Sequence, residues 1–494
     1  MSYSIGIDYG TASGRVFLIN TTNGQVVSKF VKPYTHGVIE SELNGLKIPH
    51  TYALQNSNDY LEIMEEGISY IVRESKIDPV NIVGIGIDFT SSTIIFTDDN
   101  LNPVHNLKQF KNNPHAYVKL WKHHGAYKEA EKLYQTAIEN NNKWLGHYGF
   151  NVSSEWMIPK IMEVMNRAPE IMEKTAYIME AGDWIVNKLT NKNVRSNCGL
   201  GFKAFWEEET GFHYDLFDKI DPKLSKVIQD KEMTMVMGTS TCHLMLNEKQ
   251  HQVPGISGSV KGAIIPELFA YEAGQSAVGD LFEYVAKQAP KSYVDEAENR
   301  NMTVFELMNE KIKHQMPGKS GLIALDWHNG NRSVLSDSNL TGCIFGLTLQ
   351  TKHEDIYRAY LEATAFGTKM IMQQYQDWHM EVEKVFACGG IPKKNAVMMD
   401  IYANVLNKKL IVMDSEYAPA IGAAILGAVS GGAHNSINDA VDAMKEPILY
   451  EINPEAEKVQ RYETLFKAYK ALHDIHGYKK ANIMKDIQSL RVEG

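Results

Sequence analysis

The sequence predicts an α/β protein made of two related domains that face a common cleft. A chain of 494 residues is too long for a single hydrophobic core. Apolar, strand-like runs alternate with amphipathic helix patterns in both halves. Two stretches, "IGIDYGTASGRVFLI" at 5–19 and "MTMVMGTSTCHLML" at 233–246, repeat one arrangement in which Gly-Thr joins two apolar runs. We therefore expect one domain over residues 1–231 and a second over 232–494.

The strand and helix patterns give each half a recognisable order. In the first half, the apolar runs predict strands near 4–8, 14–20, 25–31 and 81–88. In the second half, they predict strands near 233–237, 242–246, 260–264, 384–388 and 409–413. Helices are expected over 58–75, 393–406 and 455–477, and a helix rich in small residues over 417–431 should pack tightly on a sheet. No fifth strand is evident in the first half.

Composition and charge narrow the class of protein. The net charge of −10 argues against a protein that binds nucleic acid or an anionic membrane. The four cysteines lie far apart without a C-x-x-C pair, which fits a reducing compartment and neither a disulfide framework nor a zinc site. The strand pattern begins at Tyr3, and no apolar stretch is long enough to span a membrane. We expect a cytoplasmic protein.

The two Gly-Thr turns suit phosphate. Glycine lets backbone N–H groups approach an anion, and hydroxyls add donors, so Gly10 and Thr11 in the first turn match Gly238 and Thr239 in the second. Asp8 ends the first strand. Its carboxylate either bonds the amides of its own turn or holds a phosphate-bound Mg²⁺ through water. Met237 occupies the matching place in the second turn, so the metal is expected on one side only.

Two adjacent histidines, His123 and His124, cannot share a helix face as metal ligands spaced i, i+4 do. We expect surface or substrate-loop histidines.

A series of motifs in order resembles the FGGY-type carbohydrate kinases, and among them the members that phosphorylate L-ribulose. The resemblance runs almost end to end and rests on "GIDYGTASGR", "DFTSST", "PHAYVKLWKHH", "SSEWMIPKI", "EAGDW", "GFKAFW", "MGTSTCH", "YEAGQSAVGDLF", "ALDWHNGNRS", "ATAFGT" and "ACGGIPKKN". It implies two RNase-H-like domains, as in actin and Hsp70, hinged around ATP and a sugar. The implied reaction is ATP-dependent phosphorylation of L-ribulose to L-ribulose 5-phosphate in arabinose breakdown, with Mg²⁺.

The resemblance also implies roles for single residues. Asp8 would hold Mg²⁺, and the ATP phosphates would lie among Gly10, Thr11, Gly238, Thr239 and Ser240. The adenosine would lie against Gly389 and Gly390, with Asn395 nearby, and the sugar would be bound by Ser91, Lys203 and Glu272. The residues themselves support two of these roles. Lys203 in "GFKAFW" and Glu272 in "YEAGQS" are charges among apolar neighbours and therefore need a polar partner.

One part of the family pattern is missing. The kinases it resembles take the proton of the sugar hydroxyl with the aspartate of an Asp-Ala-His motif just before the second turn, and this sequence contains no such motif. The family also carries several dozen more residues between Lys203 and Thr239. We interpret 226–231 as the scar of a deletion that removed a strand, a helix and the catalytic base. Asp221 and Asp230 are the nearest carboxylates, and neither ends an apolar strand.

Three hypotheses follow. The first is a kinase of L-ribulose, or of another ketopentose, whose catalytic competence depends on a replacement base. The second is a non-catalytic protein that still binds nucleotide and sugar. The third, an ATPase like actin or Hsp70, is disfavoured because residues 100–200 are rich in Trp, His and Lys and resemble a sugar-binding lobe. The sequence leaves open a homodimer and the exact sugar.

Overall fold

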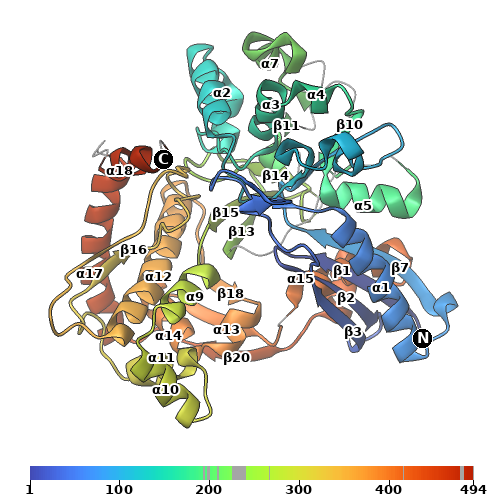
Figure 1. Cartoon of the computed structure of the whole chain (residues 1–494). Coiled ribbons are helices and arrows are strands. Elements are labelled where there is room, and N and C mark those ends of the chain that lie inside the picture. Colours follow the sequence, from blue (N-terminus) through green and yellow to red (C-terminus); the bar gives the residue numbers. More distant parts are fainter. Residues whose placement is uncertain are drawn as a thin grey trace.

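The computed structural model describes residues 1–192, 195–196, 201–207, 211–224, 241–265, 267–415, 417–478 and 483–492. Figure 1 shows the N-terminal elements, blue to green, gathered on one side and most C-terminal elements, yellow-green to red, on the other. The mixture of helices and sheets confirms the predicted α/β class. Among the described residues, no helix has the length and apolar character needed to cross a membrane.

The first sheet contains the predicted hairpin. Its strands are β1 (Tyr3–Tyr9), β2 (Ser13–Asn20), β3 (Val26–Pro33) and β7 (Ile82–Phe89), in the order β3-β2-β1-β7. These match all four strands predicted for the first half. β1 and β2 pair antiparallel, whereas β1 and β7 run parallel with Asp8 opposite Asp88. Within the described part of the chain, β7 is the last strand of this sheet.

Two helices from distant parts of the chain cover the faces of this sheet. Helix α1 (Asn58–Ser75) packs on β2 and β3, and its Tyr60 and Ile63 are buried in the core of this sheet. Helix α15 (Ala418–Ser430) packs on β1 and β7, and Figure 1 shows this orange helix among the blue strands. The predicted small-residue helix therefore packs on a sheet, and that sheet belongs to the N-terminal half.

A lobe rich in helices, formed mostly by residues after β7, has its own apolar core. Its sheet has the order β10-β8-β9-β6, and its core includes Trp144, Trp156 and Phe205. The sheet strands are β6 (Leu54–Gln55), β8 (Ile94–Thr97), β9 (Val118–Lys119) and β10 (Tyr177–Glu180). The helices are α2 (Tyr127–Glu139), α3 (Met157–Arg167), α4 (Pro169–Met172), α5 (Ala181–Thr190) and α7 (Tyr214–Ile220).

Short elements complete this half of the chain. The small strand pairs are β4 (Glu42–Leu43) with β5 (Leu46–Lys47) and β11 (Trp206–Glu207) with β12 (Gly211–Phe212). The 3-10 helices are η1 (Pro79–Asn81), η2 (Val104–Asn106), η3 (Lys108–Phe110), η4 (Pro114–Ala116) and η5 (Lys143–Tyr148).

The C-terminal half has two three-stranded sheets around a large core. One has the order β13-β15-β14, with strands β13 (Thr241–Asn247), β14 (Ser259–Lys261) and β15 (Phe269–Gln275). The other has the order β18-β19-β20, with strands β18 (Lys384–Ala387), β19 (Lys409–Met413) and β20 (Ile448–Ile452). A smaller pair joins β16 (Ile323–Leu325) to β17 (Cys343–Phe345). The predicted strand at 233–237 lies outside the described residues, and β15 was not predicted.

Helices surround these sheets. The central one is α12 (His353–Asp377), most of whose residues are buried. The others are α9 (Gly279–Lys287), α10 (Lys291–Asn299), α11 (Val304–Ile312), α13 (Gly390–Lys394), α14 (Ala396–Leu406), α16 (Ile437–Met444), α17 (Ala456–Gly477) and α18 (Ile483–Val492). The predicted C-terminal helix at 455–477 corresponds to α17, which buries Tyr462, Phe466 and Tyr469.

Candidate functional site

Two carboxylates meet where β1 and β7 end. Asp8 and Asp88 are paired neighbours in the parallel register, and both are buried. Arg15 Nη1 lies 2.6 Å from Asp8 Oδ2, so Asp8 forms an ion pair across the hairpin. Burial raises the pKa of the Asp8 carboxyl above its ordinary value, and Arg15 offsets only part of that shift. The pair of carboxylates is the kind of oxygen donor set that Mg²⁺ prefers.

The turn between β1 and β2 is tightly held. Gly10 N donates to Ser13 O at 3.0 Å, and Tyr34 Oη donates to Gly10 O at 2.9 Å. A Cβ at Gly10 would lie 2.9 Å from Arg15 Nη1 and 3.2 Å from Ser13 O, so a larger residue would displace the Arg15 side chain from its place beside Asp8. Gln55 Nε2 donates to Thr11 O at 2.7 Å. The matching residues of the second turn, Gly238, Thr239 and Ser240, lie outside the described residues.

Lys203 and Glu272, each predicted to need a polar partner, are partners of one another. Lys203 Nζ donates to Glu272 Oε1 at 2.8 Å, and both side chains are almost completely buried. Glu272 lies on β15, so the contact joins the N-terminal lobe to the C-terminal half. The second carboxylate oxygen, Oε2, is buried and has no hydrogen-bond partner among the described residues. It remains able to accept a hydrogen bond from a ligand hydroxyl.

Ser91 lies in a turn that buried charges hold from several sides. Glu180 accepts hydrogen bonds from the backbone N–H groups of Ser92 and Thr93, both at 3.1 Å. Lys160 Nζ donates to Ser92 O at 2.7 Å. Burial raises the pKa of Glu180 to about 7 and lowers that of Lys160 to about 7. The Ser91 hydroxyl is buried and has no hydrogen-bond partner within the described part of the chain.

The same buried charges connect Ser91 to the Lys203–Glu272 pair. The charge of Lys203 contributes to the lowered pKa of Glu155 and opposes the rise that burial causes in the pKa of Glu180. Glu155 O in turn accepts a hydrogen bond from Ser92 Oγ at 2.7 Å. The structure therefore gathers all three predicted sugar residues in one region, next to the end of β7.

The predicted adenosine residues lie at the start of two helices in the other half. Gly389 has φ of 109°, a value that favours glycine, and the space where its Cβ would lie is open. Gly390 begins α13. Asn395 caps α14, accepting from Met398 N at 3.0 Å and donating to Tyr357 Oη at 3.2 Å. Its amide thus has a structural task in addition to any contact with a nucleotide.

The two candidate replacement bases can be placed only in part. Asp221 follows α7, where its carboxylate accepts a hydrogen bond from Lys223 N at 2.9 Å. Figure 1 shows α7 at the outer end of the N-terminal lobe, beside α3. Asp230 and the segment 226–231 lie outside the described residues.

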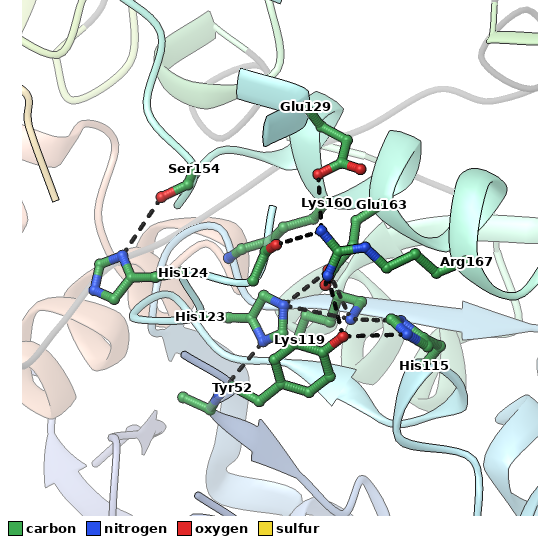
Figure 2. Close-up of polar contacts among 12 residues, drawn as sticks. Tyr52, His115, Lys119, His123, His124, Glu129, Ser154, Lys160, Glu163 and Arg167 are labelled. Atoms are coloured by element: carbon green, nitrogen blue, oxygen red, sulfur yellow. Dashed lines mark hydrogen bonds and ion pairs between the residues drawn. The ribbon is translucent and has the colours of Figure 1, made fainter. Parts of the chain in front are cut away.

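A buried polar network, not predicted from the sequence, underlies the segment 115–124. Lys119 Nζ lies 3.0 Å from Glu163 Oε2, and His123 Nε2 lies 2.8 Å from the same oxygen. His115 and Arg167 complete the cluster that Figure 2 shows around Glu163. His123 is completely buried, so the expectation of a surface position for it is wrong. His124 points away from the cluster, toward Ser154 (Figure 2).

The histidines of this lobe give a pH prediction. Burial lowers the pKa of His105 and of His115 to about 4 and that of His123 to about 3. We expect these imidazoles to stay neutral from pH 8 to pH 5, as measured by NMR of their ring protons. Each histidine contributes stability that is present above the unfolded-state pKa of about 6.5 and is lost, at about 1.4 kcal/mol per pH unit, as pH falls toward the folded-state value. A titration midpoint near pH 6.5 for any of these imidazole rings would contradict the effect of burial on its pKa.

The sequence reasoning missed the charged residues that hold the site, namely Glu155, Lys160, Glu180 and Arg332. Arg332 Nε donates to Glu155 Oε2 at 2.9 Å from a segment far along the chain. A signal was present for two of them. Lys160 in "WMIPKIM" and Glu180 in "YIMEAG" are charges in apolar runs, as Lys203 is.

Comparison with known proteins identifies the family. The FGGY family of carbohydrate kinases matches with its N-terminal domain over residues 3–199 and its C-terminal domain over 233–431. Ribulokinases of Staphylococcus aureus strains Mu3 / ATCC 700698 and USA300 are 90% identical over 545 residues, covering 100% of this chain and 100% of each relative. Because this chain has 494 residues, at least 51 of the 545 aligned positions have no residue of it opposite them.

Solved structures with the same fold are more distant in sequence. A xyloylose kinase from Brucella ovis aligns with a TM-score of 0.73 at 15% identity, covering 96% of this chain and 99% of that one. Plasmodium falciparum glycerol kinase with ADP aligns with a TM-score of 0.68 at 17% identity, covering 96% and 98%. The sequence matches and the shared fold agree, and this chain belongs to the FGGY family of carbohydrate kinases.

Proposed function

We propose that this chain binds L-ribulose and Mg·ATP at the site described above and that its reaction is phosphorylation of L-ribulose to L-ribulose 5-phosphate in arabinose breakdown. The observation that carries the proposal is the buried Lys203–Glu272 pair beside the Ser91 turn. The Glu272 Oε2 and Ser91 Oγ atoms are buried with no hydrogen-bond partner among the described residues. A polyhydroxy ligand would satisfy both groups, which are otherwise costly to bury. The names of the Staphylococcus aureus relatives support L-ribulose as that ligand.

The phosphoryl donor fits the other side of this region. The Gly10-Thr11 turn offers backbone N–H groups and a hydroxyl to phosphate, and Asp8 with Asp88 suits Mg²⁺. Bound Mg²⁺ neutralises charge on the phosphates during transfer. The raised pKa of Asp8 reflects a buried carboxylate whose cost Arg15 offsets only in part, which favours a further cation beside it.

We also propose that the chain lacks the group that accepts the proton of the sugar hydroxyl. The sequence has no Asp-Ala-His motif, and the aligned relatives have at least 51 positions without a counterpart here. The family match leaves residues 200–232 between its two domains, the region in which we infer the deletion. Since 494 residues can match only about nine-tenths of 545 positions, an identity of 90% leaves room for very few substitutions elsewhere. Binding residues would therefore be retained although the base is lost.

The binding half of this proposal can be tested without turnover. We expect Lys203→Met combined with Glu272→Gln to weaken L-ribulose binding at least about tenfold, since each removes a charged hydrogen-bonding group. The double variant leaves no unpaired buried charge, which a single one would. Binding of Mg·AMP-PNP should stay close to wild type. Titration calorimetry with each ligand separately measures both effects.

A matched control is Lys311→Met, which removes a lysine on α11 that forms an ion pair with Glu296 at 2.8 Å. Its affinities for L-ribulose and Mg·AMP-PNP should equal those of the wild type. Equal loss of both ligands in the double variant would mean that the Lys203–Glu272 pair is structural. Failure of the wild-type chain to bind L-ribulose at all would contradict the proposed substrate.

A further inference from the structure

Arg332 reaches from the C-terminal half into the N-terminal lobe. It lies in the segment between β16 and β17, and its Nε donates to Glu155 Oε2 at 2.9 Å. Both side chains are less than a tenth exposed. Burial lowers the pKa of Arg332, but Glu155, followed by Cys242 and Glu272, raises it above the ordinary value. The guanidinium therefore lies within the field of the charges that surround the proposed sugar site.

The face of the same guanidinium lies on an aromatic ring. Arg332 Cζ is 4.7 Å from the centre of the Trp121 ring, within the range of a cation–π contact. The N–H edge of that indole contacts the turn between β1 and β2, because Trp121 Nε1 donates to Thr11 Oγ1 at 3.0 Å. This Gly10-Thr11 turn is proposed above to bind phosphate and is called the phosphate turn below. A continuous path of contacts thus runs from Glu155 through Arg332 and Trp121 to Thr11.

The path is anchored at Trp121. Lys119 and His123, two residues before and two residues after it, are completely buried and both contact Glu163, as Figure 2 shows. His123 Nδ1 accepts from Ala53 N at 3.3 Å, so its Nε2–H is the atom that donates to Glu163. Trp121 as a whole residue is only 8% exposed. A side chain fixed on both sides can transmit a displacement instead of absorbing it.

A second contact holds Arg332 against the C-terminal sheet. A Cβ at Gly274 would lie 3.1 Å from Arg332 Cδ, and Gly274 N donates to Ser333 Oγ at 3.1 Å. Gly274 is on β15, two residues after Glu272. A ligand that shifts Glu272 on this strand therefore acts on Arg332 from the same side.

We propose that Trp121 and Arg332 are positioning residues that couple the sugar site to the phosphate turn. The proposal rests on the proposed function. A ketopentose held by Glu272 and Lys203 fixes Arg332 between Glu155 and β15, and the indole N–H then fixes the Thr11 hydroxyl where the nucleotide phosphates bind. Coupling between two sites is reciprocal, so the nucleotide strengthens sugar binding by the same factor.

The test is the coupling ratio, that is, the Kd of Mg·AMP-PNP without L-ribulose divided by its Kd with saturating L-ribulose. For the wild-type chain we expect a ratio of at least about five, the lower end of the usual range for coupled sites. Trp121→Phe keeps a ring under Arg332 and removes the N–H. This variant should still bind each ligand alone, and its ratio should fall to about one. Calorimetry on the full chain gives both constants.

Two further variants separate this role from a structural one. Thr11→Val removes the acceptor of the indole N–H and should also abolish the coupling, whereas Thr11→Ser keeps the hydroxyl and should restore it. Trp184→Phe is the matched control, because Trp184 is a buried tryptophan whose Nε1 donates to Leu101 O at 2.8 Å in a different part of the lobe. Its ratio should equal that of the wild type.

The outcomes distinguish the inference from the function on which it rests. If L-ribulose and Mg·AMP-PNP both bind and the ratio is the same in the wild type and Trp121→Phe, the coupling path is wrong and the proposed function stands. The same holds if the wild-type ratio is one. If Trp121→Phe does not fold, a Thr11→Val ratio equal to that of Thr11→Ser overturns the inference. If the wild type does not bind L-ribulose, the proposed function fails and the inference fails with it.

Discussion

Steady-state ADP release with L-ribulose should be at least about a hundredfold slower for this chain than for the ribulokinase of Staphylococcus aureus. Transfer of a phosphoryl group to a sugar hydroxyl needs a carboxylate that accepts the proton, and such a base contributes about 10²–10⁴-fold. The sequence has no Asp-Ala-His motif, and Asp221 lies at the end of α7 in a contact with Lys223. The assay compares both purified, monodisperse proteins under saturating Mg·ATP and L-ribulose.

The positive control follows from the alignment. Inserting the relative's unmatched segment between residues 225 and 232 should restore turnover, since nearly all other aligned positions are identical. Turnover of about 1–100 s⁻¹ by the unaltered chain, as is typical of kinases, would contradict the loss of the base. Asp230→Asn would then show whether that residue has taken over its role.

Loss of the inferred segment should also make the chain more prone to aggregate. In the described part of the chain, β7 has β1 on one side and ends the sheet. Ile85 on β7 is 39% exposed. An unpaired edge with apolar side chains favours association with other chains. The chain that carries the inserted segment should therefore remain monodisperse at concentrations at which the unaltered chain aggregates. The same two purified proteins serve for this measurement.

The parts of the fold predicted from sequence are those set by local pattern. Strands β1, β2, β3 and β7 are continuous apolar runs with turn residues between them, and α17 has an apolar stripe at helical spacing. Strand β15, "FAYEAGQ", was missed because it contains the buried Glu272 and a glycine, which interrupt the apolar pattern. In the β10-β8-β9-β6 sheet, β6 and β9 were missed because two residues carry no periodicity. Strands β8 and β10 have only four residues each, which is too short for a clear alternation.

For the site, local context revealed single charges and not their partners. Lys203 and Glu272 stood out as charges among apolar residues, and the structure pairs them. The contact of Glu155 with Arg332 joins residues 177 positions apart, and one sequence carries no signal for that pairing. The burial of His123 has the same explanation, because it depends on Glu163 from helix α3.

The packing of α15 on the first sheet gives the second prediction with a large effect. Three glycines of β1 and β7 face the helix: a Cβ at Gly86 would lie 1.8 Å from Ala423 O, one at Gly6 1.9 Å from Ala420 O, and one at Gly84 2.1 Å from Gly427 O. These neighbours are backbone oxygens, which cannot rotate away as a side chain can. The helix lies directly on the strands because neither surface carries side chains of any size there.

Gly86→Ala should therefore destabilise the chain by about 3 kcal/mol or more, since the added methyl forces the helix from the sheet. Gly422→Ala is the matched control: it lies on α15 itself with open space where its Cβ would be, and helix propensity should make it neutral or stabilising by up to about 1 kcal/mol. Urea unfolding followed by circular dichroism measures both. Because α15 comes from the C-terminal half and packs on β1 and β7, the strands that carry Asp8 and Asp88, Gly86→Ala should also weaken Mg·AMP-PNP binding, which Gly422→Ala should leave intact. Similar unfolding midpoints for the two variants would mean that α15 is not held on the N-terminal sheet in solution.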